Sequence, residues 1–190
     1  MKNDRNRLIV GITGASGVIY GIRLLECLKK YAANVETRLI ISPSAEKNIG
    51  IETDYAIDSV KELADVVDEH NDFTAPVSSG SFKTRGMIVA PCSIRTLSNI
   101  ANSNNNNLLV RTADVALKEG RKLVLVPRES PLHKGHLELM TKVADIGAII
   151  LPPMPAFYHS PKTIDDIIDH TVGKVLDQFD IEHDLFKRWG

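Results

Sequence analysis

Short apolar runs of strand length alternate along the chain with segments of helical period. Runs dense in Ile, Val and Leu are typical of parallel strands that are covered on both faces. Four such runs are clear and a fifth is weaker: 7–13, 35–41, 87–90, 123–126 and 148–151. The alternation predicts an α/β domain with a mainly parallel sheet.

The segments between these runs have the features of helices. Val18, Ile22 and Leu25 recur every three to four residues, which predicts a helix over 17–30 with one buried face. Further helices are predicted to begin after Ser42 and to cover 94–101, 108–119, 137–146 and 163 to about 179.

Two helix starts are marked by their capping residues. Ser42 followed by Pro43 is typical of an N-cap and the first helical position, and Ser93 caps the next helix in the same way. The asparagine-rich run 102–107 is predicted to be a loop between two helices, because asparagine side chains compete for backbone hydrogen bonds.

Length and the absence of an internal linker predict a single domain over 1–190. The tail of about 180–190 carries Phe186 and Trp189 beside Lys187 and Arg188. Large apolar side chains are seldom left on the surface of a monomer, so we expect this tail to dock on a neighbouring subunit. A homo-oligomer is therefore predicted.

Charge and cysteine content exclude several classes of protein. The 23 Lys and Arg residues are balanced by 24 Asp and Glu residues, so the chain lacks the basic excess that nucleic acids and anionic membranes require. No run approaches the roughly 18 apolar residues of a membrane-spanning helix. Cys27 and Cys92 lie far apart, which indicates neither a disulfide framework nor a zinc site. A reducing, cytoplasmic location is expected.

In an open parallel sheet, ligands bind beyond the carboxyl ends of the strands. The loop after the first strand reads Gly11-Ile12-Thr13-Gly14-Ala15-Ser16-Gly17. It matches neither the phosphate-binding Walker A motif nor GxGxxG, and it is not a nucleophile elbow. Its glycines would let backbone N–H groups approach an anion closely, although a tight packing turn is the alternative.

Two further strand-end loops are predicted to meet this one. Ser93 and Thr96 open a helix directly after the strand 87–90, so hydroxyls and free N–H groups would form an anion site. Cys92 is interpreted as a small buried hydrophobe rather than a nucleophile, because no histidine lies near it in sequence. Arg128 and Glu129 follow the fourth strand, which places a cation and a carboxylate at the same edge.

Two other segments carry candidate chemistry. His133 and His136 lack the i, i+4 spacing of a helical metal pair and have no third ligand, so no metal site is predicted. The stiff, apolar loop 152–161 is predicted to be a pocket wall, with Tyr158 offering a polar tip.

Seven short motifs, in order and at fitting intervals, resemble the UbiX/Pad family of flavin prenyltransferases. The resemblance covers residue 8 to about 179 and predicts a three-layer Rossmann-like (flavodoxin-like) fold. The motifs are Thr13-Gly14-Ala15-Ser16-Gly17, Ser79-Gly80-Ser81-Phe82, Ala90-Pro91-Cys92-Ser93, Arg111-Thr112-Ala113-Asp114-Val115, Leu117-Lys118-Glu119, Val126-Pro127-Arg128-Glu129 and Pro155-Ala156-Phe157-Tyr158.

The resemblance implies that the chain joins the dimethylallyl group of dimethylallyl phosphate to reduced FMN, making the prenylated flavin that a UbiD-type decarboxylase uses. It implies large symmetric assemblies, with a dodecamer expected. It also implies FMN contacts from Gly14, Ala15, Ser16, Ser42, Ser93, Ile94, Arg95, Thr96, Arg111 and Arg128. The prenyl phosphate would meet Lys118, Arg128, Tyr158 and Lys174, while Ser16, Glu52, Lys118 and Glu129 would be catalytic, without a metal.

Two departures from the family pattern stand out. Lys174 replaces the usual arginine and lacks the bidentate fork that matches phosphate oxygens. The asparagine run 104–107 is also unusual for the family. Two alternatives stay open at this point, an FMN-dependent cysteine-type decarboxylase of the related fold and a non-catalytic FMN carrier.

Overall fold

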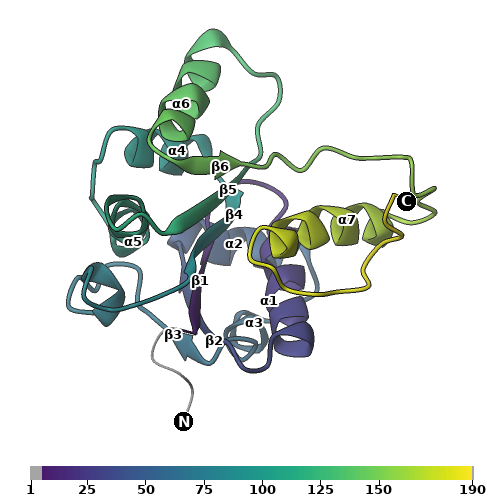
Figure 1. Ribbon diagram of the computed structural model, residues 1–190, viewed down its shortest axis with the longest axis horizontal. Helices are drawn as coiled ribbons and strands as arrows, with labels where there is room; N and C mark the ends of the chain where they lie inside the picture. The colour runs from purple at the N-terminus through teal and green to yellow at the C-terminus, as the bar shows by residue number, and fades with distance from the viewer. Residues whose placement is uncertain (1–5, 190) are drawn as a thin grey trace.

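The computed structural model describes residues 6–189, which form a parallel six-stranded sheet between two layers of helices (Figure 1). The strand order is β3-β2-β1-β4-β5-β6, and every neighbouring pair is parallel. The strands are β1 (Arg7–Ile12), β2 (Glu36–Ile41), β3 (Val66–Val67), β4 (Gly86–Cys92), β5 (Lys122–Pro127) and β6 (Ala148–Ile150). The predicted Rossmann-like fold is confirmed.

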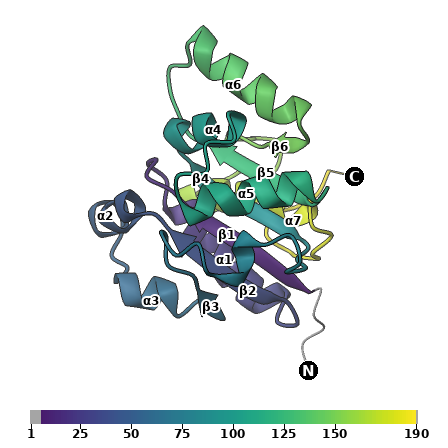
Figure 2. The ribbon, with the colours of Figure 1, turned by 90° about the vertical axis from the view of Figure 1, so that its left-hand side faces the viewer.

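The helices divide between the two faces of the sheet, as the two views show (Figures 1 and 2). One face carries α1 (Ile19–Tyr31), α2 (Pro43–Glu52), α3 (Ile57–Lys61) and α7 (Ile164–Asp177). The other carries α4 (Ile94–Ala101), α5 (Leu108–Lys118) and α6 (Lys134–Asp145).

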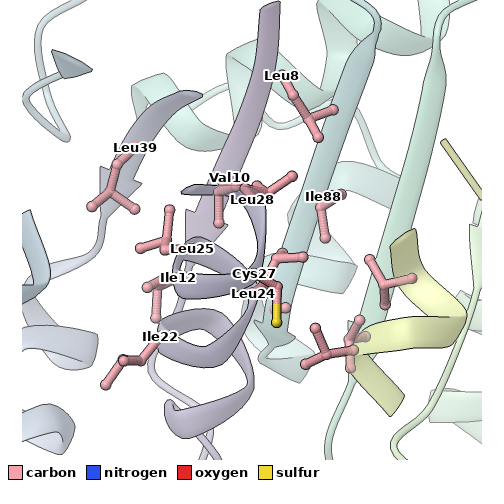
Figure 3. Packing of buried hydrophobic residues seen from close by; sticks show 14 of the residues in the cluster. Leu8, Val10, Ile12, Ile22, Leu24, Leu25, Cys27, Leu28, Leu39 and Ile88 are labelled. Carbon is pink, nitrogen blue, oxygen red and sulfur yellow. The ribbon is translucent and has the colours of Figure 1, made fainter. Parts of the chain in front are cut away.

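Successive side chains of β1 point to opposite faces of the sheet and belong to two apolar clusters, one on each face. Leu8, Val10 and Ile12 pack with α1 in one apolar cluster, whereas Ile9 belongs to the cluster on the opposite face. Figure 3 shows the first cluster, with the side chains of α1 against β1. Because both faces are covered, the strands are apolar without a polar face, which explains their continuous apolar runs.

The predicted helices and strands are found, with small shifts in their ends. The sequence analysis missed α3, β3 and the 3₁₀ turn Pro76–Ser78. β3 has two residues at the sheet edge, too short for an apolar run to reveal. Helix α6 begins at Lys134 instead of 137, since His133 caps it by accepting the N–H of Gly135.

The tail folds back along α7. Phe186 lies over Gly173 and its ring is 4.7 Å from that of His170, measured between centroids. Arg188 pairs with Asp177 at 2.7 Å, while Trp189 stays 84% exposed. The docking of this tail on a neighbouring subunit stays a prediction, and its last residue, Gly190, lies outside the described residues.

Strand order reverses between β1 and β4, which are neighbours although they are distant in sequence. Loops that leave adjacent strands toward opposite faces part at such a point and open a crevice. The loop after β1 leads to α1 on one face, and Ser93 leads from β4 to α4 on the other. The crevice between them is where a ligand is expected.

Candidate functional site

A cavity of about 470 Å³ opens at this reversal point, beyond the carboxyl ends of the strands. Its volume lies in the usual range for cofactor sites, about 300–1,000 Å³. Twelve residues from five segments line it: Gly14, Ser42, Pro43, Ser44, His70, Asn71, Ser93, Arg95, Thr96, Asn99, Asn106 and Asn107. Five of them, Gly14, Ser42, Ser93, Arg95 and Thr96, were predicted from the sequence.

The buried hydroxyl of Thr13 ties two walls of this cavity together. It donates to the carbonyl of Pro91 at 2.8 Å and accepts the backbone N–H of Ser93, also at 2.8 Å. Thr13 is 1% exposed, so both bonds are shielded from water. The loop after β1 and the start of α4 are thereby held in register.

Two helix N-termini face the cavity. Ser42 Oγ accepts the N–H of Ala45 at 3.2 Å, and Ser93 Oγ accepts the N–H of Thr96 at 3.2 Å, which confirms both predicted caps. Each helix leaves further N–H groups of its first turn without a helical partner. Together with the partial positive charge of the helix ends, these groups make an anion site suited to a phosphate.

Gly14 is required by the close approach of two segments. A Cβ at this position would lie 2.5 Å from the Cβ of Ser44 in α2. The loop after β1 therefore reaches the start of α2 only because this residue has no side chain.

Three of the predicted catalytic and binding residues, Ser16, Glu52 and Arg128, meet at the loop after β1, and Glu129 follows Arg128 in sequence. Arg128 Nε donates to the carbonyl of Ser16 at 3.1 Å, which joins the loop after β5 to the loop after β1. Glu52 Oε2 accepts the N–H of Gly17 at 2.8 Å, at the entry to α1. Ser16, Glu52 and Glu129 are exposed, and Glu129 Oε1 accepts the N–H of Ser130 at 3.1 Å. Ala15 is buried in the same loop, and Ile94 is partly buried as the first residue of α4.

Arg111 and Lys118 lie outside this group in the single chain. Arg111 donates to the carbonyl of Ser78 at 3.1 Å and pairs with Asp114 at 3.2 Å. Lys118 ends α5 and pairs with Glu119 at 2.6 Å, lowering the pKa of that carboxyl. Three residues separate Lys118, the last residue of α5, from the start of β5. Lys118 therefore lies near the amino ends of the strands, whereas the cavity lies beyond their carboxyl ends.

Tyr158 and Lys174 are both associated with α7, since Tyr158 contacts His170 of that helix and Lys174 belongs to it. Lys174 pairs with Asp177 at 3.3 Å. Tyr158 lines a second cavity, of about 290 Å³, with His159, Lys187, Arg188 and Trp189. The loop 152–161 thus contributes two residues to a cavity wall, whereas its Met154 and Phe157 are exposed.

Seven of the twelve residues that line the cavity of about 470 Å³ were not predicted from the sequence. The asparagine run, which had no sequence explanation, has a structural one: Asn106 and Asn107 line the cavity, and Asn107 Oδ1 caps α5 by accepting the N–H of Val110 at 3.0 Å. Burial lowers the pKa of His70, another lining residue, whose Nδ1 has no hydrogen-bond partner within residues 6–189. Asn107 stands directly before the predicted helix 108–119, and its position as an N-cap was the sequence signal for this wall of the cavity.

The cysteines are structural. Cys92 is fully buried, and burial raises the pKa of its thiol to about 12, so the interpretation as a buried hydrophobe is confirmed.

His133 and His136 stack with ring centroids 3.6 Å apart. In the described part of the chain, no three His, Cys, Asp or Glu side chains are grouped to hold a metal ion, and no helix has the length and apolar content to cross a bilayer.

Comparison with known proteins gives consistent matches. Residues 1–183 match the Flavoprotein family. The chain is 61% identical over 183 residues to "Flavin prenyltransferase UbiX" of Thauera aromatica, covering 96% of this chain and 93% of that protein. It is 55% identical over 185 residues to the protein of the same name from Escherichia coli K12, covering 96% of this chain and 97% of that protein.

Solved structures agree. The crystal structure of AnUbiX (PadA1) in complex with FMN and dimethylallyl pyrophosphate matches with a TM-score of 0.95 at 50% identity, covering 98% of each chain. A dodecameric FMN-dependent UbiX-like decarboxylase from Escherichia coli O157:H7 matches with a TM-score of 0.95 at 50% identity, covering 97% of this chain and 99% of that one. The peptidyl-cysteine decarboxylase EpiD, at 20% identity and a TM-score of 0.60 over 79% of this chain and 82% of that one, shares the fold alone.

Proposed function

The chain belongs to the flavoprotein family of UbiX flavin prenyltransferases, and from this premise we propose how its own residues serve that activity. The protein is a flavin prenyltransferase that uses FMN. Bound in the larger cavity, reduced FMN supplies the acceptor for the dimethylallyl group. The observation that carries this assignment is the cavity itself, in which two helix N-termini converge beside Gly14.

The cavity residues fit the parts of FMN. N–H groups and hydroxyls at Ser42, Ser93 and Thr96 suit the phosphate, since helix N-termini favour anions. Arg95 adds a positive charge at the same wall. The loop from Gly14 to Ser16 offers backbone groups for the edge of the ring system, held in place by Arg128.

We assign proton transfer to Glu129, the carboxylate that follows Arg128 in sequence. Prenyl transfer breaks a carbon–oxygen bond, so cationic and hydroxyl groups must stabilise the phosphate as it leaves. Glu129 is exposed and follows Arg128, which contacts the carbonyl of Ser16. We propose that Glu129 relays a proton between the acceptor and the departing phosphate. Glu52, held by the N–H of Gly17, would orient the same loop.

A complete site needs more than one copy of the chain. Lys118, proposed to bind the prenyl phosphate, lies at the sheet edge opposite the FMN cavity, and Arg111 is bound to Ser78. We propose that neighbouring subunits bring these cations, with Tyr158 and Lys174, to the cavity of the first chain. A closed homo-oligomer, with a dodecamer expected, would do so through repeated identical contacts.

The direct test is anaerobic incubation of the purified protein with reduced FMN and either dimethylallyl phosphate or dimethylallyl diphosphate. Mass spectrometry of the extracted flavin is expected to show the added dimethylallyl group, and the two donors separate the substrate classes. Glu129→Gln and Lys118→Ala should slow the reaction by about 10²-fold or more. A protein that binds FMN and leaves both reactants unchanged would instead be a flavin carrier.

The cysteine-decarboxylase alternative depends on a histidine at the flavin. His70 lines the cavity, which gives that reading its single structural support. Incubating the holoprotein with a peptide ending in cysteine and measuring released CO₂ tests it. We expect no release.

The use of the product by a UbiD-type decarboxylase is also a proposal. The family resemblance implies this partner, and the chemistry supports it, because a modified flavin that is not consumed here must be released to an enzyme that uses it. A cytoplasmic location is proposed on the two free cysteines, Cys27 and Cys92, which are both buried and unbridged.

A further inference from the structure

Tyr158 is held by an imidazole that the sequence did not single out. Its Oη lies 2.9 Å from Nε2 of His170, which projects from α7. His170 is 8% exposed, whereas Tyr158 is 46% exposed, so one side of the phenol hydroxyl is occupied and the other is open. The contact fixes where this hydroxyl points.

The His170 ring is itself immobilised on both sides. His159 stacks on it with centroids 4.8 Å apart and planes inclined by 6°. Phe186 of the tail packs against it at 4.7 Å, measured between centroids. A ring packed in this way cannot swing away from Tyr158 without opening the cluster.

The open side of Tyr158 faces the cavity of about 290 Å³ that Lys187, Arg188 and Trp189 also line. The ammonium group of Lys187, a phenol hydroxyl and an indole suit a phosphate ester that carries a short apolar group, and Arg188, which pairs with Asp177, lies at the same wall. The inference therefore rests on the proposed function, in which Tyr158 meets the prenyl phosphate.

The Tyr158 hydroxyl has one proton, and Nε2 of His170 and an oxygen of the donor phosphate would compete for it. If Tyr158 donates to Nε2, only its lone pairs face a phosphate oxygen, and the contact is repulsive. If Nε2 carries the hydrogen and donates to Oη, the phenol proton is free for the phosphate. Burial, together with the charges of His159 and Lys174, lowers the pKa of His170 against the opposing effect of Asp177. The ring is therefore neutral near pH 7, and its tautomer decides between the two arrangements.

We propose that His170 is a positioning residue for the prenyl donor: its Nε2–H donates to Tyr158 Oη, which directs the tyrosine proton toward the donor phosphate. His170 touches neither substrate in this arrangement. It acts through Tyr158 alone, and that property makes the proposal testable.

The experiment is a double-mutant cycle on the full-length oligomer, with reduced FMN saturating and dimethylallyl phosphate varied. His170→Phe and Tyr158→Phe should each raise KM for the donor by about tenfold, with a smaller change in kcat. His170→Phe in the Tyr158→Phe background should add less than twofold, because the hydroxyl through which His170 acts is gone. His170→Gln keeps an N–H near the Nε2 position and should restore KM to within about threefold of wild type.

Folding is controlled in the same preparations by thermal midpoint and by FMN affinity. Equal FMN affinity in all variants is expected, because neither His170 nor Tyr158 is among the residues that line the cavity proposed for FMN. Further loss from His170→Phe in the Tyr158→Phe background, or no rescue by His170→Gln, overturns the proposal. A wild-type protein that leaves FMN unmodified overturns the proposed function as well, whereas active wild type with unaffected His170→Phe overturns the positioning role alone.

Discussion

The hydroxyl of Thr13 accepts the backbone N–H of Ser93 at 2.8 Å, across the point where the strand order reverses. Thr13→Val removes the hydroxyl and leaves the partly buried N–H of Ser93 without this acceptor. We expect a loss of about 1–3 kcal/mol in the free energy of unfolding, measured with urea. FMN affinity should fall as well, because the two cavity walls lose their link.

Thr171→Val is the matched control for this change. Thr171 is also buried, but its hydroxyl bonds only to the carbonyl of Ile167 one turn earlier in α7. FMN affinity should be unchanged in this variant. An equal loss of affinity in both variants would show that Thr13 has no specific role at the cavity.

Gly14→Ala tests the close approach of the first loop to α2. The added Cβ would lie 2.5 Å from the Cβ of Ser44, so the loop or the start of α2 must shift. FMN affinity, measured by flavin fluorescence, should fall by about tenfold or more. Gly50→Ala is the control: its Cβ meets nothing within 4 Å, and it should stabilise α2 by up to about 1 kcal/mol without changing affinity.

The thiols provide a test of burial. Burial raises the pKa of Cys27 to about 11 and that of Cys92 to about 12, so neither forms a thiolate at pH 8. Ellman's reagent should label neither cysteine in the native protein and both in guanidinium. Cys92→Ala should retain prenyl transfer. Rapid native labelling at Cys92 would reopen its role as a nucleophile.

Stability should depend on pH through His70. Burial lowers the pKa of His70 below its ordinary value of about 6.5, so the unfolded chain binds the proton first as pH falls. The free energy of unfolding should therefore decrease from pH 6.5 toward pH 5. His70→Gln should flatten that slope. Asn71→Ala alters the same wall without removing a titrating group and should leave the slope as it is.

Mixed assemblies test whether neighbouring subunits share a site. Lys118→Ala and Glu129→Gln proteins, each inactive alone, are co-expressed and purified together. If Lys118 comes from a second chain, random mixing should restore about a quarter of the wild-type activity. Activity no greater than that of the separate variants would mean that Lys118 serves its own chain.

The alternation of apolar runs was enough to predict the layers, because a parallel sheet covered on both faces needs continuous apolar strands. Both predicted serine caps formed as expected, since capping depends on residues within one turn. The carboxyl ends of parallel strands lie at the same edge of a sheet, so the loops after β1, β4 and β5 could be predicted to come together there. The contact between Arg128 and Ser16 follows from that shared edge.

Long-range packing set which residues from distant segments lie together. His70 and Asn106 line the cavity of about 470 Å³ because β3 and α5 bring their loops to the reversal point, a matter of topology and not of local pattern. His170 meets Tyr158 because the loop before α7 folds back on that helix. Short-range patterns were enough to predict the fold and the two serine caps at the cavity, since both depend on residues that are close in sequence. The separation of Lys118 from that cavity depends on the direction of α5 relative to the sheet, which long-range packing alone sets.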